Sequence, residues 1–408
     1  MKILHLSTYD IAGGGAIAAY RLHRGLIDSG IESRMLVQNR SSQDPTVEAL
    51  PSLPIQSLTH RLLRERWARV LREHRQRDGL PDGMISDSDA PYRPNDFKAI
   101  DDADLVHLHW TTGMLDWPTV LPWLASRKPL VWTLHDMNPF LGTQHYRDPA
   151  ETLPTAFARW DQRVFARKRK LLDTIPRNRL HFVAPSRWIK GVAEQSVSMS
   201  GREIHHIPNG IAEDSFRALE QRAVVRKSLG IPEDRLVIGF VAQSMAEPRK
   251  GMSQLLDVLG QKELSESRSI LLCAGGNPLS SSTLPTIYLG SIQSERLMNL
   301  FYNALDLFVC PSLADNLPNT VMEAMACGVP TIAFAVGGIP EMVRPGISGW
   351  IADRPGDVAS LSEAMRSAMR ELSSGGDYRK RCQVFIQSEY SLSRQVASMA
   401  QLYRSLIG

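Results

Sequence analysis

The sequence predicts an α/β protein built from two doubly wound parallel-sheet domains that face each other across a cleft. Three observations lead to this fold. The chain has 408 residues, which is more than one hydrophobic core usually supports. Short apolar, β-branched segments alternate with helical patterns from the first residue onward, as they do in sheets covered by helices. The alternation is interrupted once, by a stretch rich in proline, glycine and asparagine at residues 207–216, and then begins again.

Each element is predicted from its apolar period and from the turn residues that flank it. In the first half we expect strands at residues 2–6, 34–38, 104–109, 130–135 and 181–184, and helices at 16–29, 60–77, 117–126, 155–172 and 187–198. In the second half we expect strands at 236–241, 270–274, 286–289, 307–310 and 331–334, and helices at 252–259, 295–304, 319–326 and 358–370. A last helix, at 392–406, has no strand after it.

The composition is that of a globular enzyme, with 43% hydrophobic and 22% charged residues. Four widely spaced cysteines form no CxxC pair, which disfavours a disulfide framework or a structural zinc site and favours a reducing compartment. The N-terminal segment turns polar after six residues and no apolar run is long enough to span a membrane. We therefore expect a cytoplasmic protein.

One segment is strongly basic. Residues 60–77 contain seven arginines, while Leu63, Trp67, Val70 and Leu71 fall on one helical face. The simpler interpretation is a helix that packs on the core and exposes a basic face. The alternative is a peripheral contact with anionic lipid on the inner face of the plasma membrane, or with an anionic acceptor. We expect no nucleic-acid partner.

In parallel sheets, ligands bind beyond the carboxyl ends of the strands. Gly13, Gly14 and Gly15 follow the first strand and open a helix, where backbone N–H groups suit a phosphate or a sugar hydroxyl. With Ala18 they also match a dinucleotide fingerprint, but residues 37–39 lack the acid that NAD requires. Arg40 leaves an NADP site open, and a plain tight turn is a further alternative.

Histidines follow or occupy two neighbouring predicted strands. His107 and His109 lie on one face of a strand, but no third or fourth ligand is spaced to join them, so we predict no metal site. His135 ends the next strand, and we expect its side chain to reach the cleft with Asp136 orienting the ring. A core histidine is the alternative for His135 and the favoured interpretation for His107.

Two adjacent cations, Arg249 and Lys250, lie between a strand and a helix in the second half. They could be a solvated helix start, but at this edge of a sheet they would neutralise a diphosphate leaving group. Lys250 is the stronger candidate.

Two helix starts follow strands further along. Pro318 presets the first, and we expect the N–H groups of Asn319, Thr320 and Val321 to be free for an anion, with Glu323 one turn later binding ribose hydroxyls. The second is GGIPE at residues 337–341, whose glutamate is equally well explained as a complement to the helix dipole.

In this order, the residues resemble the GT-B retaining nucleotide-sugar glycosyltransferases, specifically glycosyltransferase family four. The resemblance covers nearly the whole chain, and its most specific motifs are DNLPNTVMEAMACGVPTIAF and GGIPE, supported by TLHD, VAPSRW, IPNGI and PRKGM. It implies Rossmann-like domains and a C-terminal helix that crosses back onto the first domain. We accordingly place an acceptor domain at residues 1–205 with helix 388–408, and a donor domain at 206–387.

The resemblance also implies residue roles. Asp315 stands where the family's E-x7-E motif has its first glutamate, which holds the donor sugar, and Glu323 matches the second, on the ribose. Lys250 matches the diphosphate-binding lysine, and His135 the cleft histidine that touches donor sugar or acceptor. The implied catalytic set is His135, Asp315 and Lys250. Donor-binding residues are Arg249, Lys250, Asn319, Thr320, Glu323, Gly14 and Gly15, and acceptor-binding residues are Gly13, His109 and Asp136.

Two positions depart from the family pattern. The first motif acid is an aspartate, and the arginine that the family usually places shortly before its lysine is replaced by Gln243 or Ser244.

The expected reaction is transfer of a sugar from a nucleoside diphosphate sugar to a glycan or glycolipid hydroxyl in cell-surface polysaccharide biosynthesis, without a cofactor or metal. Alternatives are a same-fold phosphorylase or epimerase, an NADP-dependent oxidoreductase, and a non-catalytic assembly protein.

Overall fold

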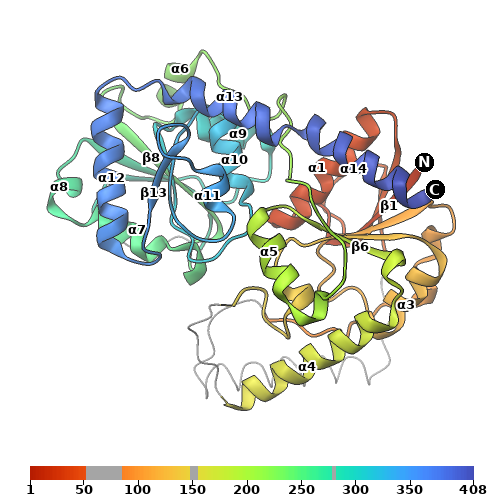
Figure 1. Ribbon diagram of the computed structural model, residues 1–408. Helices are drawn as coiled ribbons and strands as arrows, with labels where there is room; N and C mark the ends of the chain where they lie inside the picture. The colour runs from red at the N-terminus through yellow and green to blue at the C-terminus, as the bar shows by residue number, and fades with distance from the viewer. Residues whose placement is uncertain (52–84, 148–154, 278–281) are drawn as a thin grey trace. The chain divides into compact units, whose positions relative to one another are not determined.

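The computed structural model describes residues 1–51, 85–147, 155–277 and 282–408 (Figure 1). These residues form two compact units, one of residues 1–208 and 396–408 and the other of residues 209–395. The arginine-rich helix predicted at residues 60–77, with its proposed membrane contact, lies outside the described residues. Within them, no helix is both long and apolar enough to cross a membrane.

Unit 1 is built on a parallel sheet of seven strands in the order β3-β2-β1-β4-β5-β6-β7. The strands are β1 (Lys2–Tyr9), β2 (Glu32–Asn39), β3 (Val47–Ala49), β4 (Leu105–Leu108), β5 (Leu130–Thr133), β6 (Leu180–Ala184) and β7 (Ile204–His206). The helices are α1 (Gly14–Asp28), α3 (Trp117–Arg127), α4 (Thr155–Thr174) and α5 (Arg187–Gln195), with 3-10 turns η1 (Pro94–Asp96), η2 (Lys98–Ile100), η3 (Asn138–Phe140), η4 (Arg177–Arg179) and η5 (Val197–Met199). The predicted parallel sheet is confirmed.

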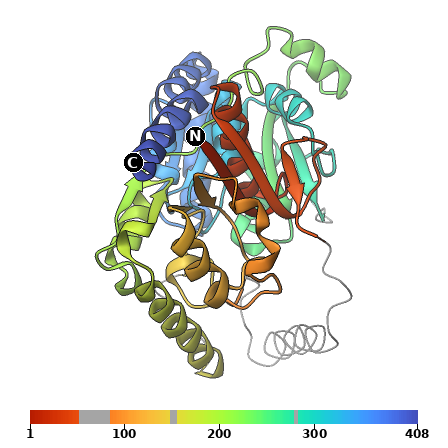
Figure 2. The same ribbon diagram turned by 90° about the vertical axis from the view of Figure 1, so that its right-hand side faces the viewer.

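The C-terminal helix α14 (Leu392–Ile407) begins in unit 2, and its residues from Val396 onward belong to unit 1. Figures 1 and 2 show its blue end beside the strands of unit 1. The Tyr403 hydroxyl is hydrogen-bonded to His107 Nδ1 of β4 at 2.6 Å, and both side chains are fully buried. The predicted crossing of the last helix back to the N-terminal domain is therefore confirmed.

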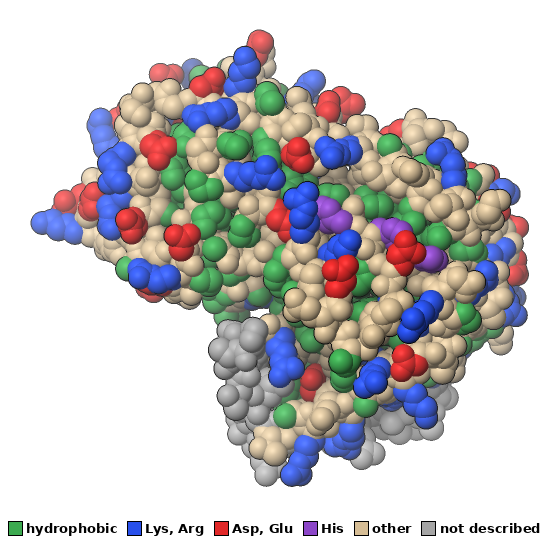
Figure 3. Space-filling model, viewed as in Figure 1, with side chains coloured by type: hydrophobic (Ala, Val, Ile, Leu, Met, Phe, Trp, Pro, Cys, Tyr) green, Lys and Arg blue, Asp and Glu red, His purple; other side chains and the backbone are tan. Residues whose placement is uncertain are grey.

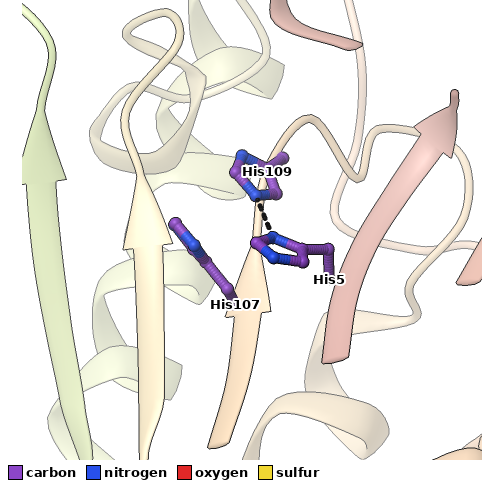
Figure 4. Close-up of side chains that lie close together, drawn as sticks. All are labelled: His5, His107 and His109. Carbon is purple, nitrogen blue, oxygen red and sulfur yellow. Dashed lines mark hydrogen bonds between the residues drawn. The ribbon is translucent and has the colours of Figure 1, made fainter. Parts of the chain in front are cut away.

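Several histidines form a buried layer on one face of the unit-1 sheet. Helices α1 and α14 contribute side chains that contact this layer. His5 pairs with His107 across β1 and β4, so their side chains share a face with His109 (Figure 4). His5 Nδ1 lies 2.9 Å from His109 Nε2. His23 of α1 is hydrogen-bonded to Ser33 at 2.7 Å. We expected no third residue to join His107 and His109, and this expectation was wrong because His5 comes from the neighbouring strand.

Unit 2 contains a parallel sheet of six strands in the order β10-β9-β8-β11-β12-β13. The strands are β8 (Leu236–Ser244), β9 (Ser269–Gly276), β10 (Thr286–Tyr288), β11 (Leu307–Cys310), β12 (Thr331–Phe334) and β13 (Gly349–Ala352). The helices are α6 (Arg222–Ser228), α7 (Met252–Leu259), α8 (Lys262–Ser265), α9 (Glu295–Ala304), α10 (Asn319–Ala326), α11 (Ile339–Met342), α12 (Val358–Ser373) and α13 (Tyr378–Tyr390), with the 3-10 turn η6 (Pro248–Lys250).

Alternate residues of the unit-2 strands point into two separate cores. Val237 of β8 packs with side chains of α9 and α10, whereas Ile238 packs with side chains of α7 and α12. Both faces of the sheet are therefore covered by helices, which confirms the doubly wound architecture. Such strands are buried on both sides, and this is why they appear in the sequence as continuous apolar segments.

Acid should destabilise unit 1 before its carboxyl groups titrate. Burial lowers the pKa of His23 and His135 to about 4 and that of His107 to about 3, and it lowers those of His5 and His109 well below the ordinary value. Below about pH 6.5 these histidines bind protons in the unfolded chain but not in the folded chain. As the pH is lowered in this range, the free energy of unfolding therefore falls by about 1.4 kcal/mol per pH unit for each histidine. Melting temperatures measured from pH 7.5 to 5.5 should decrease.

The variant His107→Gln removes one of these titrating groups and should show a shallower decrease over the same pH range. A melting temperature that stays constant from pH 7.5 to 5.5 in the unsubstituted protein would contradict buried neutral histidines.

Candidate active site

The predicted donor residues of unit 2 come from two loops that follow adjacent strands. Turn η6 carries Arg249 and Lys250 after β8, and Asp315 follows β11. Gly251 has φ 71°, and a Cβ atom there would lie 1.8 Å from the carbonyl oxygen of Pro311. The Leu313 N–H donates to Arg249 O at 2.8 Å. Only glycine fits this approach, so the chain fixes the two loops against each other.

Lys250 and Asp315 form an ion pair at this contact. The Lys250 ammonium donates to Asp315 Oδ2 at 2.7 Å, and Arg249 Nη1 lies 3.6 Å from the same oxygen. Asp315 is only 8% exposed. Burial alone would raise the pKa of this carboxyl, but Lys250, Arg249 and the Asn316 N–H together hold it below its ordinary value. Asp315 is therefore a firmly ionised carboxylate and a weak base.

Arg249 is tied to the loop as well as to the ion pair. Its Nη1 donates to the carbonyl oxygen of Ala314 at 2.7 Å, and its Nη2 lies 2.8 Å from Glu247 Oε1. The guanidinium group thus holds the backbone next to Asp315 while it adds positive charge at the edge of the sheet. The structure brings together three of the predicted residues, Arg249, Lys250 and Asp315.

Helix α10 begins after Pro318 as predicted, and its first turn carries Asn319 and Thr320. The Val321 N–H donates to Pro318 O at 3.1 Å, so the expectation that this group is free was wrong. Glu323 is 5% exposed and accepts a hydrogen bond from the Tyr302 hydroxyl at 2.8 Å. Tyr302 of α9 was missed, because an aromatic residue in a helical apolar pattern is ordinarily a core residue.

In unit 1 the glycine loop lies against His135. Gly13 caps α1 with φ 88°, and Gly14 and Gly15 form its first turn. A Cβ atom on Gly15 would lie 3.2 Å from Cγ of His135. Two predicted residues that are far apart in the sequence therefore meet here, and a side chain at position 15 would press on the imidazole ring.

The sequence predicted that His135 ends a strand, but in the structure it lies two residues past the end of β5. The strand stops at Thr133, and the His135 N–H donates to Thr133 O at 3.0 Å, which turns the chain. His135 Nε2 is hydrogen-bonded to His109 Nδ1 at 3.1 Å, and His109 Nε2 to His5 at 2.9 Å. Burial lowers the pKa of His135 to about 4 although Asp136 opposes the shift. The imidazole of His135 is therefore neutral at physiological pH.

Asp136 is hydrogen-bonded to other groups than His135, whose ring we expected it to orient. Its Oδ2 accepts hydrogen bonds from Trp110 Nε1 at 2.9 Å and from His145 Nδ1 at 2.5 Å, and its Oδ1 accepts from the Asn138 N–H at 2.9 Å. The ring of His135 is oriented by His109, and Asp136 acts on it through charge. His109, His135 and Asp136 line one small pocket of unit 1.

Lys168 of α4 supports the same loop and was not predicted. Its ammonium donates to Asn138 O at 2.9 Å and to Gly142 O at 2.6 Å, and the side chain is 1% exposed. Burial lowers the pKa of Lys168 to about 7, more than Asp136 and other carboxylates raise it. In the sequence Lys168 is part of a basic run, and the residues of such a run are ordinarily exposed.

Two family models match the chain. The model described as Glycosyltransferase Family 4 matches residues 12–215, and the model described as Glycosyl transferases group 1 matches residues 235–371. The first covers half of the chain and includes the glycine loop and His135. The second includes Lys250, Asp315 and Glu323.

Curated relatives are similar over most of the chain. D-inositol 3-phosphate glycosyltransferase 2 of Catenulispora acidiphila is 24% identical over 404 residues, which are 92% of this chain and 86% of that protein. D-inositol 3-phosphate glycosyltransferase of Thermobispora bispora is 26% identical over 375 residues, 84% of this chain and 78% of that protein.

Solved structures share the fold over the whole length. Sucrose-phosphate synthase of Thermosynechococcus elongatus superposes with a TM-score of 0.69 at 19% identity, covering 100% of this chain and 99% of that one. HepE of Anabaena, in complex with UDP and glucose, superposes with a TM-score of 0.69 at 17% identity, covering 99% and 100%. With this fold, and with a family model that spans half of its length, the chain is a glycosyltransferase of the GT-B type and belongs to glycosyltransferase family 4.

Proposed function

We propose that this glycosyltransferase moves a sugar from a nucleoside diphosphate sugar to a hydroxyl of a glycan or glycolipid, with retained anomeric configuration and without a metal ion. The observation that carries the proposal is the cluster of Lys250, Arg249 and Asp315, which gathers cations and an ionised carboxylate at the carboxyl edge of the unit-2 sheet. UDP and glucose in the complex of HepE support a donor of this class.

Lys250 would stabilise the diphosphate as negative charge develops on it. An ammonium group has three N–H donors, so Lys250 can keep its bond to Asp315 and still donate to a phosphate oxygen. Arg249 shares the charge that the family's missing arginine would supply. Because these cations are held before the reaction by Asp315 and the Ala314 carbonyl, little reorganisation is needed when the leaving group departs.

Asp315 would bind hydroxyls of the donor sugar. Lys250 occupies one lone pair of Oδ2 and the Asn316 N–H one of Oδ1, and each carboxylate oxygen can accept further hydrogen bonds. An aspartate reaches less far than the glutamate of the family pattern, so the sugar would sit closer to the backbone of this loop. That difference is a means of donor selection.

Glu323 would bind the ribose next to the first turn of α10. The Tyr302 hydroxyl fixes the orientation of the Glu323 carboxylate before any ligand arrives. Asn319 and Thr320 would contribute from the start of α10, and Gly14 and Gly15 from the start of α1.

His135 would form a neutral hydrogen bond with the donor sugar or the acceptor. Its partner His109 has both ring nitrogens engaged, and Asp136 is held by three donors. These contacts favour positioning roles for His109 and Asp136 over direct acceptor binding, which leaves Gly13 at the acceptor side.

The reaction would follow a front-face course in which the departing phosphate removes the proton of the acceptor hydroxyl. Asp315 is a poor general base because Lys250 and Arg249 lower its pKa. The strongest base near the anomeric carbon is then the leaving phosphate itself. This assignment needs no covalent enzyme intermediate.

A role in cell-surface glycan or glycolipid synthesis is supported by the descriptions of similar proteins. One solved neighbour, WaaG, is described as involved in lipopolysaccharide biosynthesis, and the curated relatives are named for D-inositol 3-phosphate, an anionic compound. We propose that the chain works in the cytoplasm on acceptors of this kind, and that residues 60–77 bring it to the inner face of the plasma membrane.

Replacement of Lys250 tests the leaving-group role. Lys250→Ala should lower kcat at saturating donor by about 10²- to 10³-fold because one preorganised charge is removed, whereas Lys250→Arg should retain more activity. Nucleoside diphosphate release measures turnover, and Lys262→Ala, an exposed lysine of the same unit, is the control. An unchanged kcat in Lys250→Ala would rule out the role.

The donor can be identified by thermal shift with a panel of nucleotide sugars, since a ligand that binds the native state raises its melting temperature. We expect one sugar to stabilise the protein most, and Asp315→Glu to change that ranking while Glu363→Gln leaves it unchanged. An identical ranking in Asp315→Glu would mean that Asp315 does not select the sugar.

A pH profile tests the state of His135. Because its pKa is lowered to about 4, kcat/KM should show no inflection from a histidine between pH 6 and 8. His135→Gln should lower kcat/KM and leave the shape of the profile unchanged. An inflection near pH 6.5 that vanishes in His135→Gln would show that the imidazole titrates in the working range.

A further inference from the structure

Two histidines and a glutamate converge at the edge of the unit-1 sheet, apart from the predicted sugar site. His181 belongs to β6, His205 to the edge strand β7, and Glu203 immediately precedes β7. Phe182 pairs with Ile204 across these strands. Residues 181, 203 and 205 therefore share one face of the sheet.

The distances within this group are unlike those of hydrogen bonds. His181 Nδ1 lies 3.5 Å from Glu203 Oε2, and His205 Nε2 lies 3.5 Å from Glu203 Oε1. An N–H···O bond is ordinarily about 2.7 to 3.2 Å long. Two ligand atoms of a tetrahedral zinc site, each about 2.1 Å from the metal, are about 3.4 Å apart. All three ligand atoms lie within 4.8 Å of one another.

The second ring nitrogen of His181 is turned toward a backbone carbonyl. Its Nε2 lies 3.4 Å from the carbonyl oxygen of Asn178, while Nδ1 faces the Glu203 carboxylate. A backbone carbonyl at the second ring nitrogen is the usual support of a metal-bound histidine.

The ring nitrogens that face Glu203 have no other use. His181 Nδ1 and His205 Nε2 are both buried and lack a hydrogen-bond partner within the part of the chain that the structure describes. His181 is 7% exposed, while the side chain of Glu203 is 65% exposed and gives solvent access to the group. Histidine side chains reach the surface on the face shown in Figure 3.

The buried histidines of Figure 4 differ in this respect. His107 uses both ring nitrogens in hydrogen bonds with Tyr403 and Thr133, and His5 and His109 are bonded to each other. Of the ring nitrogens of these three histidines, only His5 Nε2 lacks a partner in the described part of the chain, and their group contains no carboxylate. The group at β6 and β7 has two unpartnered ring nitrogens, a carboxylate and access to solvent.

We propose that His181 Nδ1, His205 Nε2 and Glu203 bind a divalent transition-metal ion such as Zn²⁺, with water at the fourth position. Two imidazoles and a carboxylate are a ligand set that Zn²⁺ uses in proteins. The ion would join the edge strand β7 to β6, just before the boundary between the units at residue 208. It would act in stability and not in sugar transfer, because His181 lies at the start of its strand.

The cation nearest to this group is itself paired with a carboxylate. Lys190 is ion-paired with Glu194 at 3.6 Å, which moderates its repulsion of a bound cation.

Zinc binding to the full chain, stripped with a chelator, tests the proposal. Competition with a chromophoric chelator should reveal one Zn²⁺ bound with a Kd that rises at least about tenfold in Glu203→Gln and in His205→Gln. Zn²⁺ at a hundredfold excess over Kd should raise the melting temperature by roughly 5 °C. The control Glu194→Gln removes a neighbouring exposed carboxylate of α5 and should bind Zn²⁺ as the unsubstituted protein does.

Three results would overturn the proposal. They are the absence of tight Zn²⁺ binding by the unsubstituted protein, undiminished binding by the Glu203→Gln/His205→Gln double variant, and an equal loss of binding in Glu194→Gln. Melting temperatures without metal check that each variant is folded. Glu203→Gln alone carries the test if His205→Gln is unstable, since the Glu203 side chain is mostly exposed.

Discussion

A buried carboxylate that must be paired organises the carboxyl edge of the unit-2 sheet in this glycosyltransferase. Burying an ion without a partner costs several kcal/mol, and Asp315 is 8% exposed. Lys250 and Arg249 offset that cost, so the loops after β8 and β11 are required to lie together. The loops can approach each other this closely only because Gly251, which lies against Pro311, has no side chain. The same ion pair lowers the pKa of Asp315 and fixes the positions of the two cations.

Unit 1 depends on neutral imidazoles in place of ions. His5, His109 and His135 are linked in series by hydrogen bonds, and burial keeps each of them uncharged at neutral pH. A series of this kind needs one proton for each bond, so the tautomer of one ring determines the next. The ring that meets substrate in the proposed reaction is thus oriented from within the core.

Much of the fold was predictable because buried parallel strands leave continuous apolar segments in the sequence. The edge strands β3, β7 and β13 were missed. Of these β7 is Ile-His-His, in which two histidines stand in place of the β-branched residues typical of a strand. The polar segment of α13 was missed for a similar reason. In the site, motifs indicated Lys250 and Asp315 separately, but their contact depends on strand order, which no local pattern encodes. Lys168 looks exposed in a run of charges and is buried.

The hydrogen bond between His107 and Tyr403 joins residues 296 positions apart. A ribosome adds about 5 to 20 residues per second, so His107 waits on the order of 15 to 60 s after its synthesis for this partner. During that interval the first sheet exists without the helix that completes one of its faces. The N-terminal unit therefore cannot finish folding as it emerges, although it is made first. Its maturation is tied to the synthesis of the whole chain, which delays a complete unit 1 until unit 2 has also been made.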